Sequence, residues 1–215
     1  MRDVLTAARV VPILRTPPAG SPLAAVAVLA SAGFPVVELT MTSPDPFGDV
    51  AAVRAAHPQM IVGLGSITMI EDLEAAVAAG ASFVVTPVAL PSLVVAAREL
   101  SIPIVPGATT PTEVHAMHRL GAEVVKVFPA GRFGPGYLRD LLGPMPDVRL
   151  VATGGVGVDD VLSYLDAGAV AVGLGSDLIG DACGPAGDLE GLQTRSHRVF
   201  AVLDDKGPRR PQRRP

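Results

Sequence analysis

Lys126 is the residue whose type and position most clearly point to covalent chemistry. The chain has 17 basic residues, of which only Lys126 and Lys206 are lysine. Lys126 lies inside the apolar run Val-Val-Lys-Val-Phe, where burial of an ammonium group is costly. A neutral lysine amine is the nucleophile of Schiff-base chemistry, whereas a guanidinium stays protonated. The alternative is a structural lysine paired with a carboxylate, which the rarity of lysine in this chain makes less favourable.

Glu38 is the second candidate, because it ends an apolar run that begins Phe-Pro-Val-Val. A carboxylate at the end of a strand, inside an apolar mouth, resists ionisation and can exchange protons with a substrate. Its alternative role is an ion pair with Lys126 or Arg15. Both roles can hold at once.

Two glycine-rich segments suggest an anion site: Gly154-Gly155 and Gly173-Leu-Gly175-Ser176. Glycines let backbone N–H groups approach an anion closely, and the Ser176 hydroxyl can donate a further hydrogen bond. Either segment alone is also typical of a simple turn. Together they favour a phosphate group.

Metal and thiol chemistry receive little support. His115 and His118 are spaced i, i+3 on a predicted helix with no third ligand nearby, so a solvated helix face is the better interpretation. The single cysteine, Cys183, has no obvious base partner and excludes an intramolecular disulfide. We therefore expect no metal, no cofactor and a cytoplasmic protein.

The elements that must position these groups alternate between short apolar runs and alanine-rich segments of helical period. Strands are predicted at 10–15, 36–40, 60–63, 83–86, 103–105, 124–128, 149–153 and 170–173. The helices that follow them begin near residues 23, 47, 70, 91, 111, 136, 159 and 185. Eight β-α units predict the α/β class, as a single-domain (β/α)8 TIM barrel over residues 1–205. An open doubly wound sheet is the alternative, and the Arg- and Pro-rich tail 206–215 is expected to be disordered.

Composition limits the remaining classes of function. The formal net charge of −4 argues against a nucleic-acid partner, which would require a basic face. The two long uncharged stretches, 16–37 and 75–97, are interrupted by prolines and glycines, so neither is expected to span a membrane.

The strand-end segments, in order, resemble the 2-keto-3-deoxy-6-phosphogluconate / 4-hydroxy-2-oxoglutarate aldolase family. The matching segments run from Val-Pro-Ile-Leu-Arg15 to Gly173-Leu-Gly-Ser176, and the specific ones are Pro106-Gly107…Thr-Glu113 and Lys126-Val-Phe-Pro-Ala130. The resemblance implies a homotrimer of barrels that needs no metal. It also implies that Lys126 forms a Schiff base with the substrate ketone and that Glu38 is the general acid/base. Cleavage of a phosphorylated 2-keto acid would then give pyruvate and an aldehyde, typically glyceraldehyde 3-phosphate.

The resemblance also implies a substrate site. Its substrate-binding residues are Arg15, Thr42, Ser66, Pro87, Phe128 and Thr153; its phosphate-binding residues are Gly154, Gly155, Gly175 and Ser176. Thr42 stands where the phosphogluconate type often has an arginine that contacts the carboxylate, which leaves Arg15 as the candidate for that contact. Thr42-Ser43-Pro44, Phe133-Gly-Pro135 and Gly-Leu-Gly-Ser-Asp177 are similar to the phosphogalactonate branch instead.

Two other functions fit the same residues. A phosphosugar isomerase or epimerase would use Glu38 for proton transfer and Lys126 only as a charge. A non-catalytic module would bind a phosphorylated ligand without turnover. The fold alone excludes neither, because this barrel carries many chemistries.

Overall fold

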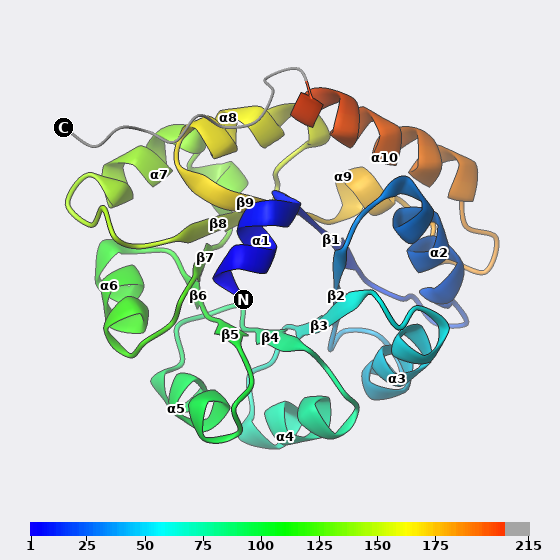
Figure 1. Cartoon of the computed structure of the whole chain (residues 1–215), viewed down its shortest axis with the longest axis horizontal. Coiled ribbons are helices and arrows are strands. Elements are labelled where there is room, and N and C mark those ends of the chain that lie inside the picture. The colour runs from blue at the N-terminus through cyan, green and yellow to red at the C-terminus, as the bar shows by residue number, and fades with distance from the viewer. Residues whose placement is uncertain (205–215) are drawn as a thin grey trace.

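The computed structural model describes residues 1–204, and within them the strands form one parallel sheet that curves into a barrel (Figure 1). The sheet order is β5-β4-β3-β2-β1-β9-β8-β7-β6. The strands are β1 (Val10–Leu14), β2 (Val36–Thr40), β3 (Ile61–Gly65), β4 (Phe83–Val85), β5 (Ile104–Val105), β6 (Gly107–Ala108), β7 (Val125–Val127), β8 (Leu150–Thr153) and β9 (Ala169–Leu174). The predicted single-domain barrel is therefore confirmed, and the open doubly wound sheet is wrong.

The strand count differs from the predicted eight because the fifth strand is interrupted. β5 pairs with β4, β6 pairs with β7, and only Pro106 lies between the two halves. A proline has no N–H to donate to the ladder, so the strand divides there. The Pro106 carbonyl still accepts a hydrogen bond from the Lys126 N–H at 2.8 Å. The two ends of the sheet thus meet through this one residue, which closes the barrel.

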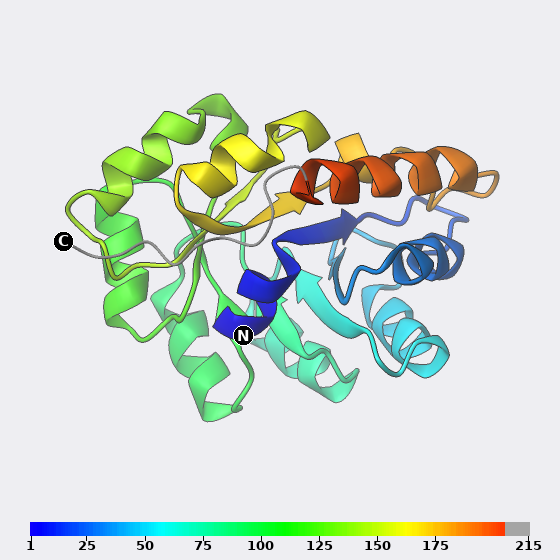
Figure 2. The same cartoon turned by 45° about the horizontal axis from the view of Figure 1, so that its top comes forward.

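The helices surround the strands, as Figure 1 shows. They are α2 (Leu23–Ala32), α3 (Pro46–Ala56), α4 (Ile70–Ala78), α5 (Pro91–Glu99), α6 (Pro111–Arg119), α7 (Pro135–Leu142), α8 (Val161–Asp166), α9 (Ser176–Ile179) and α10 (Leu189–Asp204). Short 3-10 turns, η1 (Ala130–Arg132) and η2 (Val158–Asp160), precede α7 and α8. The last helix packs against α2 and α8 (Figure 2), and it begins at Leu189 rather than near Pro185 because a glycine-rich loop comes first.

An additional helix, α1 (Arg2–Ala8), covers the N-terminal end of the barrel (Figure 1). The sequence prediction missed this element. Leu5 of α1 is buried against the apolar side chains inside the barrel, including Val11, Val36 and Val124. This end is therefore filled and closed, which leaves the opposite end for a site.

The inner side chains change from apolar to polar along each strand. In β2, Val36 belongs to the inner core, and Glu38 and Thr40 follow on the same face because side chains alternate with period two. Val124 and Lys126 repeat the pattern around β7. The strands thus place their polar residues together at their C-terminal ends, where barrel enzymes carry their sites.

A second, larger apolar core fills the layer between the barrel and its surrounding helices. No helix within residues 1–204 is long and apolar enough to cross a membrane. The tail predicted to be disordered, 206–215, lies outside the described residues, as does residue 205.

Candidate active site

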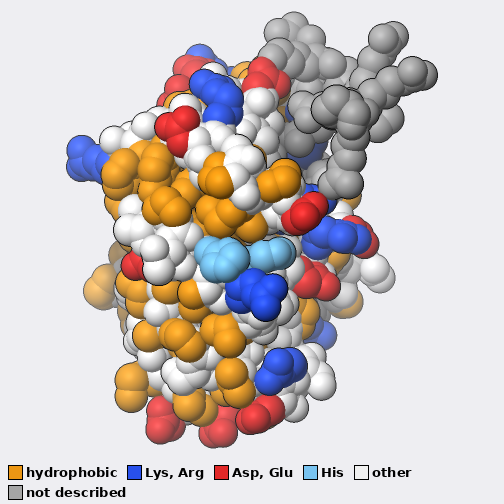
Figure 3. Space-filling model, turned by 90° about the vertical axis from the view of Figure 1, so that its left-hand side faces the viewer, with side chains coloured by type: hydrophobic (Ala, Val, Ile, Leu, Met, Phe, Trp, Pro, Cys, Tyr) orange, Lys and Arg blue, Asp and Glu red, His pale blue; other side chains and the backbone are white. Residues whose placement is uncertain are grey.

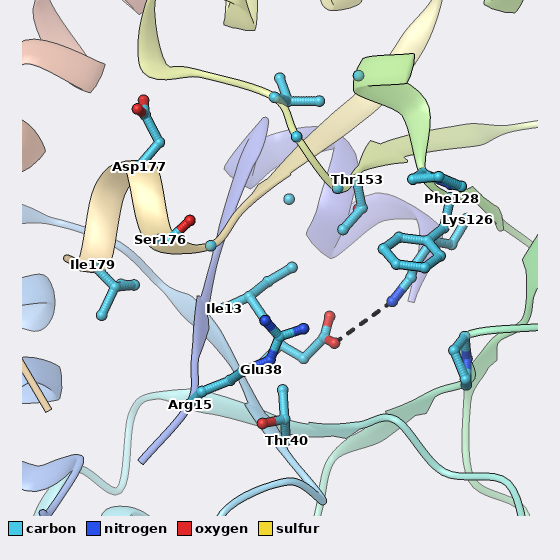
Figure 4. A pocket seen from close by; sticks show the side chains of 18 of the residues that line it. Ile13, Arg15, Glu38, Thr40, Lys126, Phe128, Thr153, Ser176, Asp177 and Ile179 are labelled. Carbon is cyan, nitrogen blue, oxygen red and sulfur yellow. Dashed lines mark ion pairs between the residues drawn. The ribbon is translucent and has the colours of Figure 1, made fainter. Parts of the chain in front are cut away.

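A cavity of about 820 Å³ opens at the C-terminal ends of the strands (Figure 4). Its size suits a small-molecule ligand. Its lining combines charged, hydroxyl and glycine positions from β1, β2, β7, β8 and β9 and from loops after these strands and after β3 and β4. The site is therefore assembled from most of the barrel rather than from one local motif.

Lys126 and Glu38 meet inside this cavity. The Lys126 Nζ atom lies 3.8 Å from the Glu38 Oε1 atom, and the side chains are only 8% and 6% exposed (Figure 4). Burial raises the pKa of the Glu38 carboxyl, and the positive charges of Lys126 and, to a smaller extent, Arg15 oppose that rise. The arrangement provides a buried amine beside a carboxyl group that holds its proton more tightly than usual.

Neighbouring side chains define one end of the cavity. Phe128 follows Lys126 by two residues, and its ring centroid lies 5.4 Å from the Lys126 Nζ atom. Arg15 follows Ile13 of β1 by two residues, and its guanidinium lies near the Glu38 carboxylate (Figure 4). Ser66 adopts a φ of 66°, a left-handed conformation that is uncommon outside glycine and that recurs at functional sites.

The glycine-rich segments form another part of the lining, and Gly154 packs against the Phe128 ring. Gly154 and Gly155 have φ values of 89° and 70°, which residues with side chains adopt only with strain. The Asp177 carboxylate accepts a hydrogen bond from the Val158 N–H at 2.6 Å, which ties the loop after β8 to α9. Because α9 has only four residues, the free N–H groups of the loops matter more here than a helix dipole.

Of the residues predicted from sequence, nearly all line this one cavity. They are Arg15, Glu38, Ser66, Pro87, Lys126, Phe128, Thr153, Gly154, Gly155, Gly175 and Ser176. Thr42 is the exception. Its side chain is exposed outside the lining, and its Oγ1 atom lies 2.9 Å from the Thr40 Oγ1 atom. Thr40 reaches the cavity in its place.

The sequence analysis also missed several lining residues. They are Ile13, Thr40, Pro129, Gly131, Arg132, Val156, Gly157, Asp177, Ile179 and Gly180, whereas Gly173 belongs to a segment already singled out from the sequence. Period-two spacing from Arg15 and Glu38 would have identified Ile13 and Thr40. Arg132 lies in η1 and Asp177 in α9, both beyond the strand ends, and no spacing rule marks them.

The remaining candidates lie elsewhere. His115 is exposed and His118 is partly exposed on α6, and Figure 3 shows histidine side chains among apolar ones on that side of the molecule. Within residues 1–204 no group of three or more His, Cys, Asp or Glu side chains could hold a metal ion. Cys183 is buried, which raises the pKa of its thiol to about 11.

A parallel barrel with a lysine and a glutamate buried together at the C-terminal ends of its strands has the architecture of a barrel enzyme. The chain belongs to the KDPG and KHG aldolase family, whose model matches residues 1–193. The protein is therefore an aldolase, a carbon–carbon lyase.

Individual relatives agree with this assignment. A 2-dehydro-3-deoxy-6-phosphogalactonate aldolase of Escherichia coli is 32% identical over 73% of this chain and 77% of its own. A 2-dehydro-3-deoxy-phosphogluconate aldolase of Haemophilus influenzae is 31% identical over 73% of this chain and 74% of its own. A designed, cube-shaped protein cage made by fusing symmetric oligomeric domains superposes with a TM-score of 0.83 at 27% identity. That match covers 92% of this chain and 72% of the cage chain.

Proposed function

We propose that the protein is a class I aldolase that cleaves a 2-keto-3-deoxy-6-phospho sugar acid to pyruvate and glyceraldehyde 3-phosphate. The observation that carries the proposal is the buried pair formed by Lys126 and Glu38 in a cavity that glycine-rich loops also line. The relatives named for phosphogalactonate and phosphogluconate substrates support the substrate class.

The chemistry begins when the neutral Lys126 amine adds to the C2 ketone of the substrate. The carbinolamine loses water and leaves a protonated imine, which acts as an electron sink. Glu38 takes the proton of the C4 hydroxyl, directly or through a water, as the C3–C4 bond breaks. The aldehyde departs, and the bonding electrons form an enamine. A proton returned to C3 and the addition of water then release pyruvate and restore Lys126, so that water balances over the cycle.

The other lining residues hold the two ends of the substrate. Arg15 and Ser66, which both line the cavity, bind the carboxylate of the pyruvyl half, while Pro87, Phe128 and Thr153 enclose the imine. The backbone N–H groups around Gly154, Gly155 and Gly175, together with the Ser176 hydroxyl, bind the phosphate. The Thr42 side chain lies outside the lining, so we assign it no direct contact with the substrate.

The test is intact-mass analysis after incubation with pyruvate and borohydride, followed by peptide mapping. Borohydride reduces the imine to a stable secondary amine, so a single pyruvyl adduct on the peptide that carries Lys126 is expected. No adduct on a folded sample would contradict the aldolase mechanism and favour an isomerase that uses Lys126 only as a charge.

We also propose that the protein is a cytoplasmic homotrimer. Large apolar side chains are exposed after the neighbouring strands β3 and β4: Met69 (57%) and Ile70 (42%) at the start of α4, and Val88 (51%) in the loop after β4. Clustered exposed apolar surface is typical of protein interfaces, and the likeness to a cage built from symmetric oligomeric domains agrees. Light scattering on the eluting protein should give the mass of three chains, and Val88→Arg should lower it.

A further inference from the structure

Arg132 is a positively charged residue at the glycine-rich end of the cavity. It is the last residue of η1, six positions after Lys126, and it lines the cavity together with Gly154 and Gly155. Within residues 1–204 its guanidinium makes no ion pair or hydrogen bond, and its side chain is exposed. It is therefore free to take a ligand as its partner.

The backbone beneath Arg132 is held firmly against the glycine-rich loop. The Gly131 N–H donates to the Gly154 carbonyl at 2.8 Å, and the Tyr164 hydroxyl donates to the Ala130 carbonyl at 3.2 Å. A side chain at Gly131 would overlap the Gly155 carbonyl, so the two segments touch. The point from which the Arg132 side chain extends is thus fixed beside this loop, although the side chain itself is free.

The charged side chains that line the cavity indicate what Arg132 can bind. Among the described residues that line the cavity, the positive side chains are Arg15, Lys126 and Arg132. Arg15 and Lys126 both contribute to the field at Glu38. The charged side chains that accept backbone N–H groups of this loop are carboxylates: Asp177 accepts from Val158 and Asp160 accepts from Gly157. Neutral N–H groups and carboxylates leave a phosphate dianion poorly balanced there, and Arg132 supplies the missing positive charge.

We propose that Arg132 binds the phosphate of the aldehyde half of the substrate and makes the enzyme select phosphorylated over unphosphorylated aldehydes. The inference rests on the proposed aldolase function. A guanidinium presents a planar pair of donors that matches two phosphate oxygens, and these charge-assisted hydrogen bonds are stronger than those from backbone N–H groups. Arg132 is thus a specificity-determining residue at the distal end of the site.

The experiment uses the condensation direction, with pyruvate and either glyceraldehyde 3-phosphate or glyceraldehyde as acceptor. The two acceptors differ only in the phosphate group. In Arg132→Ala, KM for glyceraldehyde 3-phosphate should rise by about tenfold, as expected for the loss of one charge-assisted hydrogen-bonding group. KM for glyceraldehyde and kcat for either acceptor should stay near their wild-type values.

Two further variants control the experiment. Arg132→Lys keeps the charge and should recover most of the affinity for glyceraldehyde 3-phosphate. Arg139→Ala removes an exposed arginine of α7 that does not line the cavity, and both of its KM values should match wild type. Added salt should raise the wild-type KM for the phosphorylated acceptor more than that of Arg132→Ala.

An unchanged ratio of the two KM values in Arg132→Ala would overturn the inference. The borohydride adduct with pyruvate separates this failure from failure of the proposed function. If wild type forms the adduct and the ratio is unchanged, only the role of Arg132 is wrong. If wild type forms no adduct, the aldolase mechanism is wrong and the inference falls with it.

Discussion

The Nζ atom of Lys126 and the Oε1 atom of Glu38 lie 3.8 Å apart, on strands that the sheet order separates by β1, β9 and β8. The two side chains therefore meet across the interior of the barrel rather than along one edge. Each is buried, and each comes from a position where the preceding inner residue is a core valine. Because the barrel fixes both strands, it holds the amine and the carboxyl together before any substrate arrives.

Glu38→Gln should lower kcat by about 10²- to 10⁴-fold, the usual contribution of a general acid/base. The amide has nearly the same shape, so the barrel should keep its structure. Lys126 remains, so pyruvate should still be trapped by borohydride. Steady-state kinetics and the adduct assay on one sample check both statements, and a variant with wild-type kcat would rule out Glu38 as the proton-transfer group.

The raised pKa of Glu38 also predicts the acid side of the pH profile. Burial moves this pKa above the ordinary value of 4.5, so the carboxylate needed as a base is lost at a higher pH than for an exposed glutamate. The kcat of the wild-type enzyme should therefore begin to fall with decreasing pH while still above 4.5. Glu38→Gln should lack this limb, and a limb that persists in the variant would have to come from another group.

Lys126→Arg separates covalent chemistry from charge. A guanidinium keeps the positive charge beside Glu38 but cannot form the imine. Retro-aldol activity and the borohydride adduct should both fall to background, and Lys126→Met should behave alike. A Lys126→Arg enzyme that retained turnover would instead support the isomerase alternative, in which Lys126 acts only through its charge.

The sequence was sufficient to predict the centre of this site, because there the side-chain directions follow from the local alternation along each strand. Lys126 and Glu38 each interrupt an apolar run, and the alternation along a strand determines that they face the interior. The glycine-rich segments fall directly after β8 and at the end of β9, so their place at the mouth followed from strand order alone. The division of the fifth strand was also encoded, since Pro106 cannot donate to a ladder.

The residues beyond the strand ends, at the edge of the cavity, could not be predicted in the same way. Thr42 comes only two residues after Thr40, yet the chain turns beyond β2 and the Thr42 side chain ends outside the cavity. Arg132 enters the lining because Gly131 packs on the loop after β8, a contact between segments about 23 positions apart. Contacts between loops leave no periodic pattern in the sequence. The helix α1 was missed for a similar reason: it is held by Leu5 packing on the inner core, which exists only once the barrel is closed.

Glu113 predicts a pH dependence of stability away from the site. Its carboxylate accepts from the N–H groups of Thr110 (2.7 Å) and Thr109 (2.9 Å) at the start of α6, which lowers the pKa of Glu113 below its ordinary 4.5. These bonds favour the ionised form, so their contribution is fully present above pH 4.5 and is lost as the pH falls through the lowered value. Glu113→Gln should lower the free energy of unfolding by about 1 kcal/mol at neutral pH.

Urea unfolding at a series of pH values tests this contribution. The difference in unfolding free energy between wild type and Glu113→Gln should shrink as the pH drops below 4.5. Glu74→Gln, an exposed change on α4 outside any capping box, is the matched control and should leave stability within about 0.5 kcal/mol of wild type. A difference between wild type and Glu113→Gln that stayed constant with pH would show that the charge of Glu113 is not involved.

A glycine is needed at position 65 because the Glu38 side chain lies against it, not because the Gly65 backbone adopts a conformation that other residues avoid. A Cβ atom at Gly65 would overlap the Oε1 atom of Glu38 and lie 2.7 Å from its Cδ atom. The end of a side chain can shift at modest cost in stability, so Gly65→Ala should fold, with a loss of about 1–3 kcal/mol. The shift displaces Glu38 from Lys126, and a misplacement of about 1 Å can lower kcat by about 10²-fold.

Gly136→Ala provides the control for this prediction. Gly136 lies in α7, where the nearest heavy atom to an added Cβ is the Arg139 Nη2 atom at 4.0 Å. An alanine there should keep wild-type kcat and gain about 0.5–1 kcal/mol, because glycine is a poor helix former. Thermal unfolding and kinetics of both variants give the comparison. If Gly65→Ala kept full activity, the position of the Glu38 carboxylate against β3 would not matter for turnover, and proton transfer would have to be assigned to another group.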